Sequence, residues 1–230
     1  DADKLKNSLN ILTKYIVVQI KIEKVNATLQ ILNPKTLLDS IKYFKKKNYQ
    51  IVFAGREKMP EIFKNLDVID YANSKFASVL NDYLLVRGCS LVIASASGFC
   101  MIPETLDKPL LTINSFHGVQ YFGRRVILLP SLLARTNKIF NSRIQHNYLC
   151  TYGVDCGFKV FSDMYVYHMP TNLEILQASK ELEDMMTDQI PNLTPLQQKI
   201  KKIGACPLLS SGLSRISNYY LERHQNFYEI

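Results

Sequence analysis

Short apolar runs recur through the first half of the chain, and segments long enough for a helix separate them. The runs lie at residues 15–22, 50–54, 67–69, 91–94 and 110–113. They show little polar alternation, which is typical of strands buried on both faces of a parallel sheet. Strand, helix and strand in this order favour right-handed βαβ units, so the sequence predicts an α/β fold with a doubly wound, mainly parallel, Rossmann-like sheet.

Apolar residues at helical spacing mark two of the connecting segments. Pro34 suits a helix start, and the leucine, isoleucine and phenylalanine residues after it recur at helical spacing. A second helix is expected from about Phe76 to Val86, with Gly88 as its stop signal. Its core-facing residues are expected to be Val79, Leu80, Tyr83 and Leu84.

The alternation weakens after residue 114, where the elements are expected to be further apart. They are a strand at 126–129, an amphipathic helix at 173–186 and terminal helices at 191–202 and 214–223. A length of 230 residues suits one domain. We therefore expect a single domain over residues 1–230, with its core at about 14–186 and a helical C-terminal extension at 187–230.

The formal net charge of +8 favours an anionic partner, such as nucleotide phosphates, acidic glycans, nucleic acid or anionic lipid. Part of this charge is concentrated at residues 45–47, 124–125 and 199–202. Solvated helix faces would explain the same lysines. Lysines and aromatic residues do not interleave in a single stripe, so nucleic acid is not a favoured partner.

The cysteines and the apolar runs indicate the compartment. The chain has five cysteines and no Cys-x-x-Cys pair, and Cys89 and Cys100 fall in apolar segments. These two are expected to be buried and reduced, as in a cytoplasmic protein, although Cys150 and Cys156 lie close enough in sequence for a local disulfide. No apolar run approaches the roughly 20 residues that span a bilayer.

One loop carries the strongest signal for a ligand. In an open parallel sheet, ligands bind where the carboxyl ends of strands meet loops and helix amino termini. The loop from Ser95 to Phe99 lies at such a point, and Ser95, Ser97 and Gly98 offer hydroxyl and amide donors to an anion. The dipole of the following helix adds to this attraction. A serine that simply caps the helix is the alternative.

Two other segments contribute candidate ligand-binding residues. Gly55 and Arg56 follow the second strand; the glycine permits a tight exit and the arginine suits bidentate contact with a phosphate. A surface ion pair of Arg56 with a nearby glutamate is the alternative. Glu104 follows the serine loop, where it would hold ribose hydroxyls or favour the helix amino terminus.

Signals for a metal or a nucleophile are weak. The four histidines are scattered without ligand spacing, and no Asp-x-Asp triplet is present to hold a divalent metal against a diphosphate. We therefore expect neither a metal site nor a cofactor. His117 is the only histidine in a candidate site loop, which makes it the candidate catalytic base.

Several segments, in order along nearly the whole chain, resemble a family of bacterial surface-polysaccharide glycosyltransferases. Each segment is short, but their order and spacing make the set fairly specific. They are Asn65–Ser74, Asn81–Leu84, Ile93–Gly98, Lys108-Pro109 followed by Asn114, Asn172–Ile175 and Glu183–Met185.

The resemblance implies a domain like the C-terminal lobe of GT-B enzymes, which holds a nucleotide-sugar donor without an essential metal. It adds Lys21 and Asn114 to the donor-site candidates. Two departures are visible: the first strand offers Gln19 and Lys21 where the family tends to have His and Arg, and Gly55-Arg56 replaces Arg-x-Gly. A positive charge remains at both places, but bidentate phosphate binding from the first strand is lost.

We therefore expect a glycosyltransferase that moves a sugar from a nucleotide sugar, its co-substrate, to a glycan or lipid-linked acceptor. A non-catalytic nucleotide- or glycan-binding module of the same fold is the alternative, and a nucleic-acid-binding Rossmann protein is a third class. Expected partners also include a second lobe, a partner subunit or an anionic membrane surface. The expected location is the cytoplasm, with peripheral contact at the inner membrane.

Overall fold

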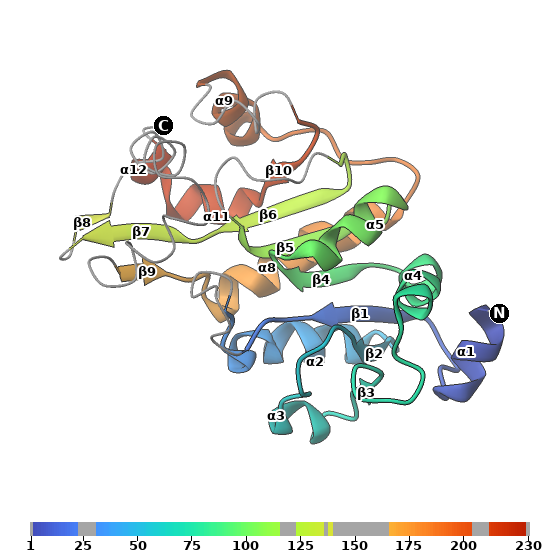
Figure 1. The fold of residues 1–230 in the computed structure, drawn as a ribbon. Coiled ribbons are helices and arrows are strands. Elements are labelled where there is room, and N and C mark those ends of the chain that lie inside the picture. Colours follow the sequence, from blue (N-terminus) through green and yellow to red (C-terminus); the bar gives the residue numbers. More distant parts are fainter. Residues whose placement is uncertain are drawn as a thin grey trace.

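A seven-stranded sheet in which every pair of neighbours is parallel forms the centre of the protein (Figure 1). The computed structural model describes residues 2–22, 31–115, 123–135, 138–139, 166–203 and 212–228. The strand order is β10-β6-β5-β4-β1-β2-β3, which is doubly wound and reverses direction between β1 and β4. The strands are β1 (Tyr15–Gln19), β2 (Gln50–Phe53), β3 (Ile69–Asp70), β4 (Val92–Ser95), β5 (Leu110–Ser115), β6 (Val126–Pro130) and β10 (Arg215–Ile216). The predicted fold class is confirmed.

Helices cover both faces of this sheet, and alternate residues of each strand enter two separate cores. Ile16 and Val18 of β1 pack into the core beneath α2, α8 and α11, whereas Tyr15 and Val17 pack into the core beneath α1, α4 and α5. The α-helices are α1 (Ala2–Ser8), α2 (Leu38–Lys46), α3 (Glu61–Lys64), α4 (Val79–Gly88), α5 (Met101–Thr105), α8 (Asn172–Glu183), α9 (Pro195–Ile203), α11 (Asn218–Arg223) and α12 (Gln225–Tyr228). The short 3-10 helices are η2 (Pro34–Leu37), η3 (Gly98–Cys100) and η4 (Asp184–Met186). None of the helices in the described ranges is long and apolar enough to cross a membrane.

Local signals in the sequence explain where two of these helices begin. The side chain of Asn33 accepts a hydrogen bond from the Lys35 amide, and Pro34 stands at the first helical position, so η2 begins there and leads into α2. Thr171 begins α8 with a capping box, in which Thr171 and Glu174 satisfy each other's backbone amides. The predicted helices at 34–46 and 173–186 are thus confirmed.

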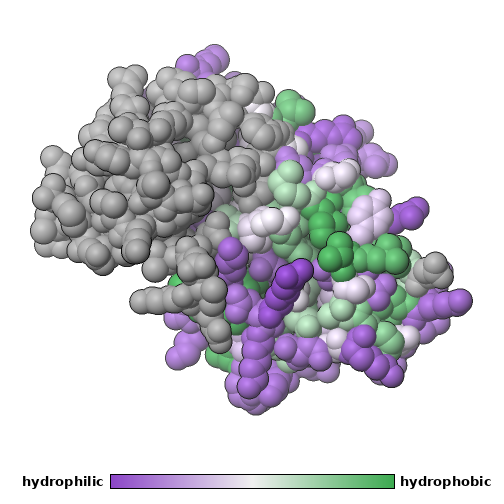
Figure 2. All heavy atoms as spheres, viewed as in Figure 1, coloured by the Kyte–Doolittle hydropathy of each residue, from purple (hydrophilic) through white to green (hydrophobic). Residues whose placement is uncertain are grey.

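The predicted buried face of α4 is wrong. Leu85 and Val86 are buried, whereas Val79, Leu80 and Tyr83 are exposed. Apolar side chains are therefore visible on the surface over α4 and α5 (Figure 2). The reason is that α4 has apolar residues on nearly all sides, so that helical spacing does not single out one face.

Two structural features are absent from the sequence prediction. Arg215–Ile216, in the expected helical extension, forms the edge strand β10 beside β6. A second, antiparallel sheet has the order β8-β7-β9, formed by Lys138–Ile139, Leu132–Arg135 and Val166–His168. Strands of two to four residues carry too few side chains for a period of two to be recognised.

Cys89 and Cys100 are buried and form no disulfide, as predicted. Burial raises the pKa of the Cys89 thiol to about 12, so this thiol stays protonated and unreactive. Cys150, Cys156 and Cys206 lie outside the described residues.

Glu174 ties the start of α8 to α11 and is almost completely buried. The Nε2 of His224 donates to Glu174 Oε1 at 2.7 Å, and the Thr171 amide donates to Glu174 Oε2 at 2.7 Å. Burial alone would raise the pKa of Glu174, but these hydrogen bonds outweigh it and lower the pKa to about 2.

We predict that Glu174→Gln removes an acid-sensitive part of the stability. The folded-state pKa lies below the unfolded value, so the contribution is complete above about pH 4.5 and is lost as the pH falls toward 2. At about 1.4 kcal/mol for each pH unit between the two pKa values, the contribution is about 3–3.5 kcal/mol. Urea unfolding at pH 7 and pH 3 should show the difference between wild type and variant shrinking. An equal difference at both pH values would contradict the assignment, and Glu61→Gln on the exposed part of α3 is the control.

Candidate functional site

The carboxyl ends of β1, β2 and β4 bring a set of polar residues together where the sheet reverses direction. We call Gln19, Lys21, Gly55, Ser95 and Ser97 the switch-point group. The parallel register places Gln19 of β1 opposite Ala94 of β4, next to Ser95. This is the edge at which ligands of open α/β sheets bind, so four predicted donor-site residues, Lys21, Gly55, Ser95 and Ser97, lie at the expected edge.

Ser97 and Gln19 join β4 to β1 across this edge. The Ser97 hydroxyl donates to Gln19 Oε1 at 3.0 Å, although the two residues are 78 positions apart in the sequence. Ser97 stands at the N-cap position of η3, yet its side chain makes no capping hydrogen bond. The alternative explanation of Ser97 as a side-chain helix cap is therefore wrong, and the hydroxyl points along the sheet edge instead.

Gly55 holds the end of β2 close to the same side chain. Its φ is +101°, a conformation that residues with a side chain rarely adopt, and a Cβ there would lie 2.9 Å from Gln19 Cγ. Glycine is thus required at this position for two reasons, and the tight exit predicted for Gly55 is confirmed. The close approach fixes the Gln19 side chain between Gly55 and Ser97.

Lys21 and Ser95 form a second link between the same strands. The Lys21 amide donates to the hydroxyl of the completely buried Ser95 at 3.2 Å. Lys21 also forms a parallel bridge with Ile31, and its carbonyl accepts from the Leu32 amide at 2.8 Å. The backbone of Lys21 therefore belongs to the switch-point group.

Asn114, at the end of β5, extends the polar edge to the next strand. Its φ of 57° is in the left-handed region that asparagine tolerates, and the β5–β6 register shifts between Ile113 and Ser115. The Asn114 Nδ2 donates to the Ile31 carbonyl at 2.8 Å. Its Oδ1 and the Ser115 Oγ are buried and have no hydrogen-bond partner among the described residues. Buried polar atoms without a partner are rare in native proteins, so each of these two needs an explanation.

Arg56 follows Gly55 and is exposed. Over the described ranges it makes no ion pair with Glu57 or Glu61, and Glu61 pairs with Lys64 at 2.7 Å instead. The nearby Asp82 has a pKa raised by burial, partly offset by a hydrogen bond from Tyr71 and by the Arg56 charge. The Tyr71 hydroxyl donates to Asp82 Oδ1 at 2.8 Å, so this acid already has a partner and leaves the guanidinium exposed.

Gly98 begins a helical stretch that is shorter than expected. η3 and α5 together run only from Gly98 to Thr105. The dipole of such a short stretch adds little, because the macrodipole is a sum over aligned peptide units. Gly98 is exposed, and a Cβ added there would meet nothing within 4 Å, so the space on that side of its Cα is open.

Two other predicted residues do not join the group. Glu104 Oε1 accepts from the Gly123 amide at 2.8 Å, and Gly123 lies just before β6, at the amino edge of the sheet. The prediction that Glu104 holds a ribose is therefore wrong, because α5 carries this residue away from the carboxyl edge.

His117, the predicted catalytic base, lies outside the described residues. Within those residues, no cluster of three or more histidine, cysteine or acidic side chains is placed to hold a metal ion.

Gln19 is the residue that the sequence analysis missed as a site residue. It is a buried polar side chain at the end of an otherwise apolar strand, and this was the signal that could have identified it. With Gln19 included, the edge offers neutral donors and acceptors from three strands, together with the exposed charge of Arg56. Such a set can hold a phosphate-bearing ligand through hydrogen bonds and one ionic contact.

The chain is similar in part to solved glycosyltransferases. A family 9 glycosyl transferase from Veillonella parvula is 14% identical, with a TM-score of 0.49, over 79% of this chain and 50% of that one. The ADP-heptose lipopolysaccharide heptosyltransferase II of E. coli is 13% identical, with a TM-score of 0.42, over 60% of this chain and 44% of that one. The iron-containing dodecameric glycosyltransferase TibC of enterotoxigenic E. coli is 15% identical, with a TM-score of 0.37, over 50% of this chain and 31% of that one. The chain thus spans half or less of the length of these proteins. No family model and no curated protein matches it. At such identities the likeness concerns the fold alone, so a function has to come from the residues of the chain itself.

The two glycines of the site should respond differently to alanine. We predict that Gly55→Ala lowers the free energy of unfolding by more than 1 kcal/mol, because the side chain would be strained at φ +101° and would displace Gln19. Gly98→Ala should leave the stability unchanged or raise it by about 0.4–1 kcal/mol, since the added methyl group meets nothing. Urea unfolding of the two variants is the measurement. Equal losses would contradict the geometry of the Gly55 turn.

Proposed function

We propose that the switch-point group binds the diphosphate of a nucleotide sugar, and that the chain is the donor-binding part of a glycosyltransferase. One observation carries this proposal: the Ser97 hydroxyl lies where the strand order reverses and donates a hydrogen bond to Gln19. It does not cap the helix that follows. Crevices at the reversal point are where open α/β sheets bind nucleotides.

The surroundings of Ser97 supply the other contacts that a diphosphate needs. Gly98 is exposed with open space beside its Cα, and Arg56 is exposed at the end of β2. Asn114 adds a buried acceptor without a partner in the described part of the chain, which suits a ribose or sugar hydroxyl. The phosphates of the ligand would thus meet hydrogen-bond donors of the protein, and a ligand hydroxyl would meet the Asn114 acceptor.

Glycosyl transfer builds negative charge on the departing nucleoside diphosphate. Arg56 and the Lys21 side chain would neutralise this charge, while the hydroxyl and amides around Ser97 would hold the phosphate oxygens. The acceptor hydroxyl needs a general base, for which His117 remains the candidate within this chain. The acceptor would be a glycan or a lipid-linked sugar.

A binding module without catalysis is the second candidate. It is favoured by Gln19, a neutral residue whose side chain is already held by Gly55 and Ser97. Such a module would bind nucleotide sugars with the same residues and would release no nucleoside diphosphate in the presence of acceptors. Measuring this release across a set of nucleotide sugars separates the two functions.

We predict that Arg56→Ala weakens the binding of a nucleoside diphosphate about ten- to a hundredfold, and Ser97→Ala by less. A hydrogen bond to a charged group contributes about 1.5–3 kcal/mol and a neutral one about 0.5–1.5 kcal/mol. Because both residues would contact one diphosphate, their effects should couple in a double-mutant cycle measured by calorimetric titration.

Arg87→Ala is the matched control for this cycle, since Arg87 is exposed in the last turn of α4, away from the carboxyl edge. It should leave the affinity unchanged. Affinity unchanged in the Arg56, Ser97 and double variants alike would remove the switch-point group from the site and would refute the proposed function.

We also predict that nucleoside diphosphate binding survives EDTA. The proposed contacts are a guanidinium, hydroxyls and backbone amides, which need no metal to meet a phosphate. The measurement is calorimetric titration with a nucleoside diphosphate, carried out once in excess EDTA and once in excess magnesium. Strict dependence on magnesium would contradict a metal-independent site.

A further inference from the structure

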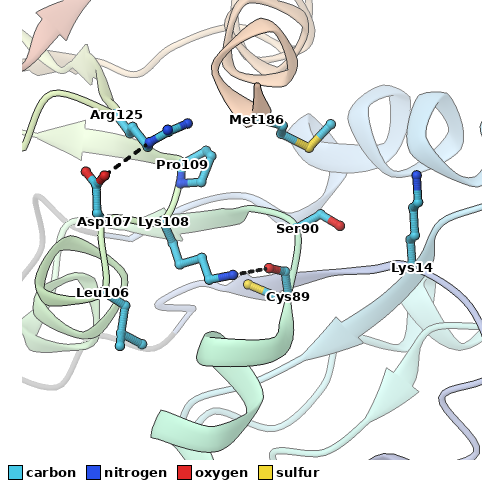
Figure 3. A pocket seen from close by; sticks show the side chains of 9 residues that line it. All are labelled: Lys14, Cys89, Ser90, Leu106, Asp107, Lys108, Pro109, Arg125 and Met186. Carbon is cyan, nitrogen blue, oxygen red and sulfur yellow. Dashed lines mark hydrogen bonds and ion pairs between the residues drawn. The ribbon is translucent and has the colours of Figure 1, made fainter. Parts of the chain in front are cut away.

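A polar cavity lies at the amino edge of the sheet, opposite the edge that carries the switch-point group (Figure 3). It has a volume of about 470 Å³. Four residues that immediately precede or lead into different strands line it: Lys14 before β1, Ser90 before β4, Lys108 before β5 and Arg125 before β6. Because the carboxyl edge is at the other end of the same strands, this cavity is separate from the switch-point group.

Three cations and one carboxylate line this cavity. Lys14 lies on one side of it, and Lys108 and Arg125 lie on the other (Figure 3). The carboxylate, Asp107, accepts from Arg124 at 2.6 Å and from Arg125 at 3.3 Å, and hydrogen bonds from these arginines lower its pKa. Asp107 is thus neutralised by its two arginines, and the charges of Lys14 and Lys108 remain uncompensated within the lining.

Two of the three cations donate to backbone carbonyls. Lys108 Nζ donates to the Cys89 carbonyl at 2.9 Å, and Arg125 Nη1 donates to the carbonyls of Met185 and Thr187. These acceptors are neutral carbonyls at the ends of α4 and η4, so their partial charges offset only part of the cationic charge. Lys14 is exposed, and its ammonium has no hydrogen-bond or ion-pair partner in the described part of the chain.

The cavity therefore combines several donors with a net positive charge, and its one acid is occupied. A multiply charged anion satisfies such a set better than a single carboxylate does, because each oxygen of a phosphate accepts from a different donor. Ser90 adds a hydroxyl between the two sides. We propose that the amino-edge cavity binds a small phosphate-bearing anion, with Lys14 and Lys108 supplying the charge and Ser90 a hydrogen bond, beside the Arg125–Asp107 ion pair.

Amide chemical shifts of the isotope-labelled full chain, titrated with inorganic pyrophosphate, test this proposal. The amides of Ser90 and Arg125 report on the amino-edge cavity, and those of Gln19 and Ser97 report on the switch-point group. We expect Ser90 and Arg125 to shift with a saturating dependence on pyrophosphate. Shifts at Gln19 and Ser97 alone would overturn the proposal but would leave the proposed function intact.

Lys14→Ala is the decisive variant, because within the described residues the side chain has no hydrogen-bond or ion-pair partner whose loss would disturb the fold. It should weaken the saturation at Ser90 and Arg125 about tenfold or more, whereas Lys14→Arg should retain most of the affinity. Lys42→Ala, at an exposed lysine of α2, is the control and should change nothing. Equal affinity of wild type and Lys14→Ala would refute the assignment.

Two further ligands define the chemical class and the source of the phosphate. Citrate, which carries carboxylates of similar total charge, should bind more weakly than pyrophosphate; equal binding would overturn the choice of phosphate. A sugar phosphate measured beside pyrophosphate distinguishes the sources. Tighter binding of the sugar phosphate supports a phosphate ester as the natural ligand, and tighter binding of pyrophosphate supports a free anion.

Discussion

The parallel pairing of β1 with β4 is the contact on which the rest of this protein depends. It joins segments about 75 residues apart in the sequence, and it marks the point where the strand order reverses. Every residue of both strands is buried, so the pairing is fixed by apolar burial on both faces and not by surface contacts. A shift of one residue would move Gln19 to the other face and separate it from Ser97.

The carboxyl edge and the amino edge of the sheet carry different kinds of side chain. At the carboxyl edge, hydrogen bonds dominate: Ser97 donates to Gln19, the Lys21 amide donates to Ser95 and Asn114 donates to the Ile31 carbonyl. The charges there are those of Lys21 and of the exposed Arg56. At the amino edge, the turns before β1, β5 and β6 place cations around one cavity. A ligand held mainly by hydrogen bonds suits the first edge, and a small anion held mainly by charge suits the second.

The sequence predicted the elements better than it predicted their partners. The strands of the main sheet before residue 131, the helix that starts at Pro34 and the helix at 173–186 were recognised, because short apolar runs, a proline at a helix start and helical spacing are local signals. β10 was missed because two residues give no periodicity. The exposed face of α4 was misjudged because its residues are apolar on almost every side.

For the candidate site, the sequence alone determined that Ser95, Ser97 and Gly55 follow buried strands, since strand ends and glycine turns can be read from neighbouring residues. Only the tertiary structure decided that Ser97 contacts Gln19, that Glu104 lies at the opposite edge, and that Lys14 faces the same cavity as Lys108 and Arg125. The physical reason is that these neighbours depend on strand order and register. Order and register follow from how all the apolar faces are buried together, a property of the whole chain that no single segment contains.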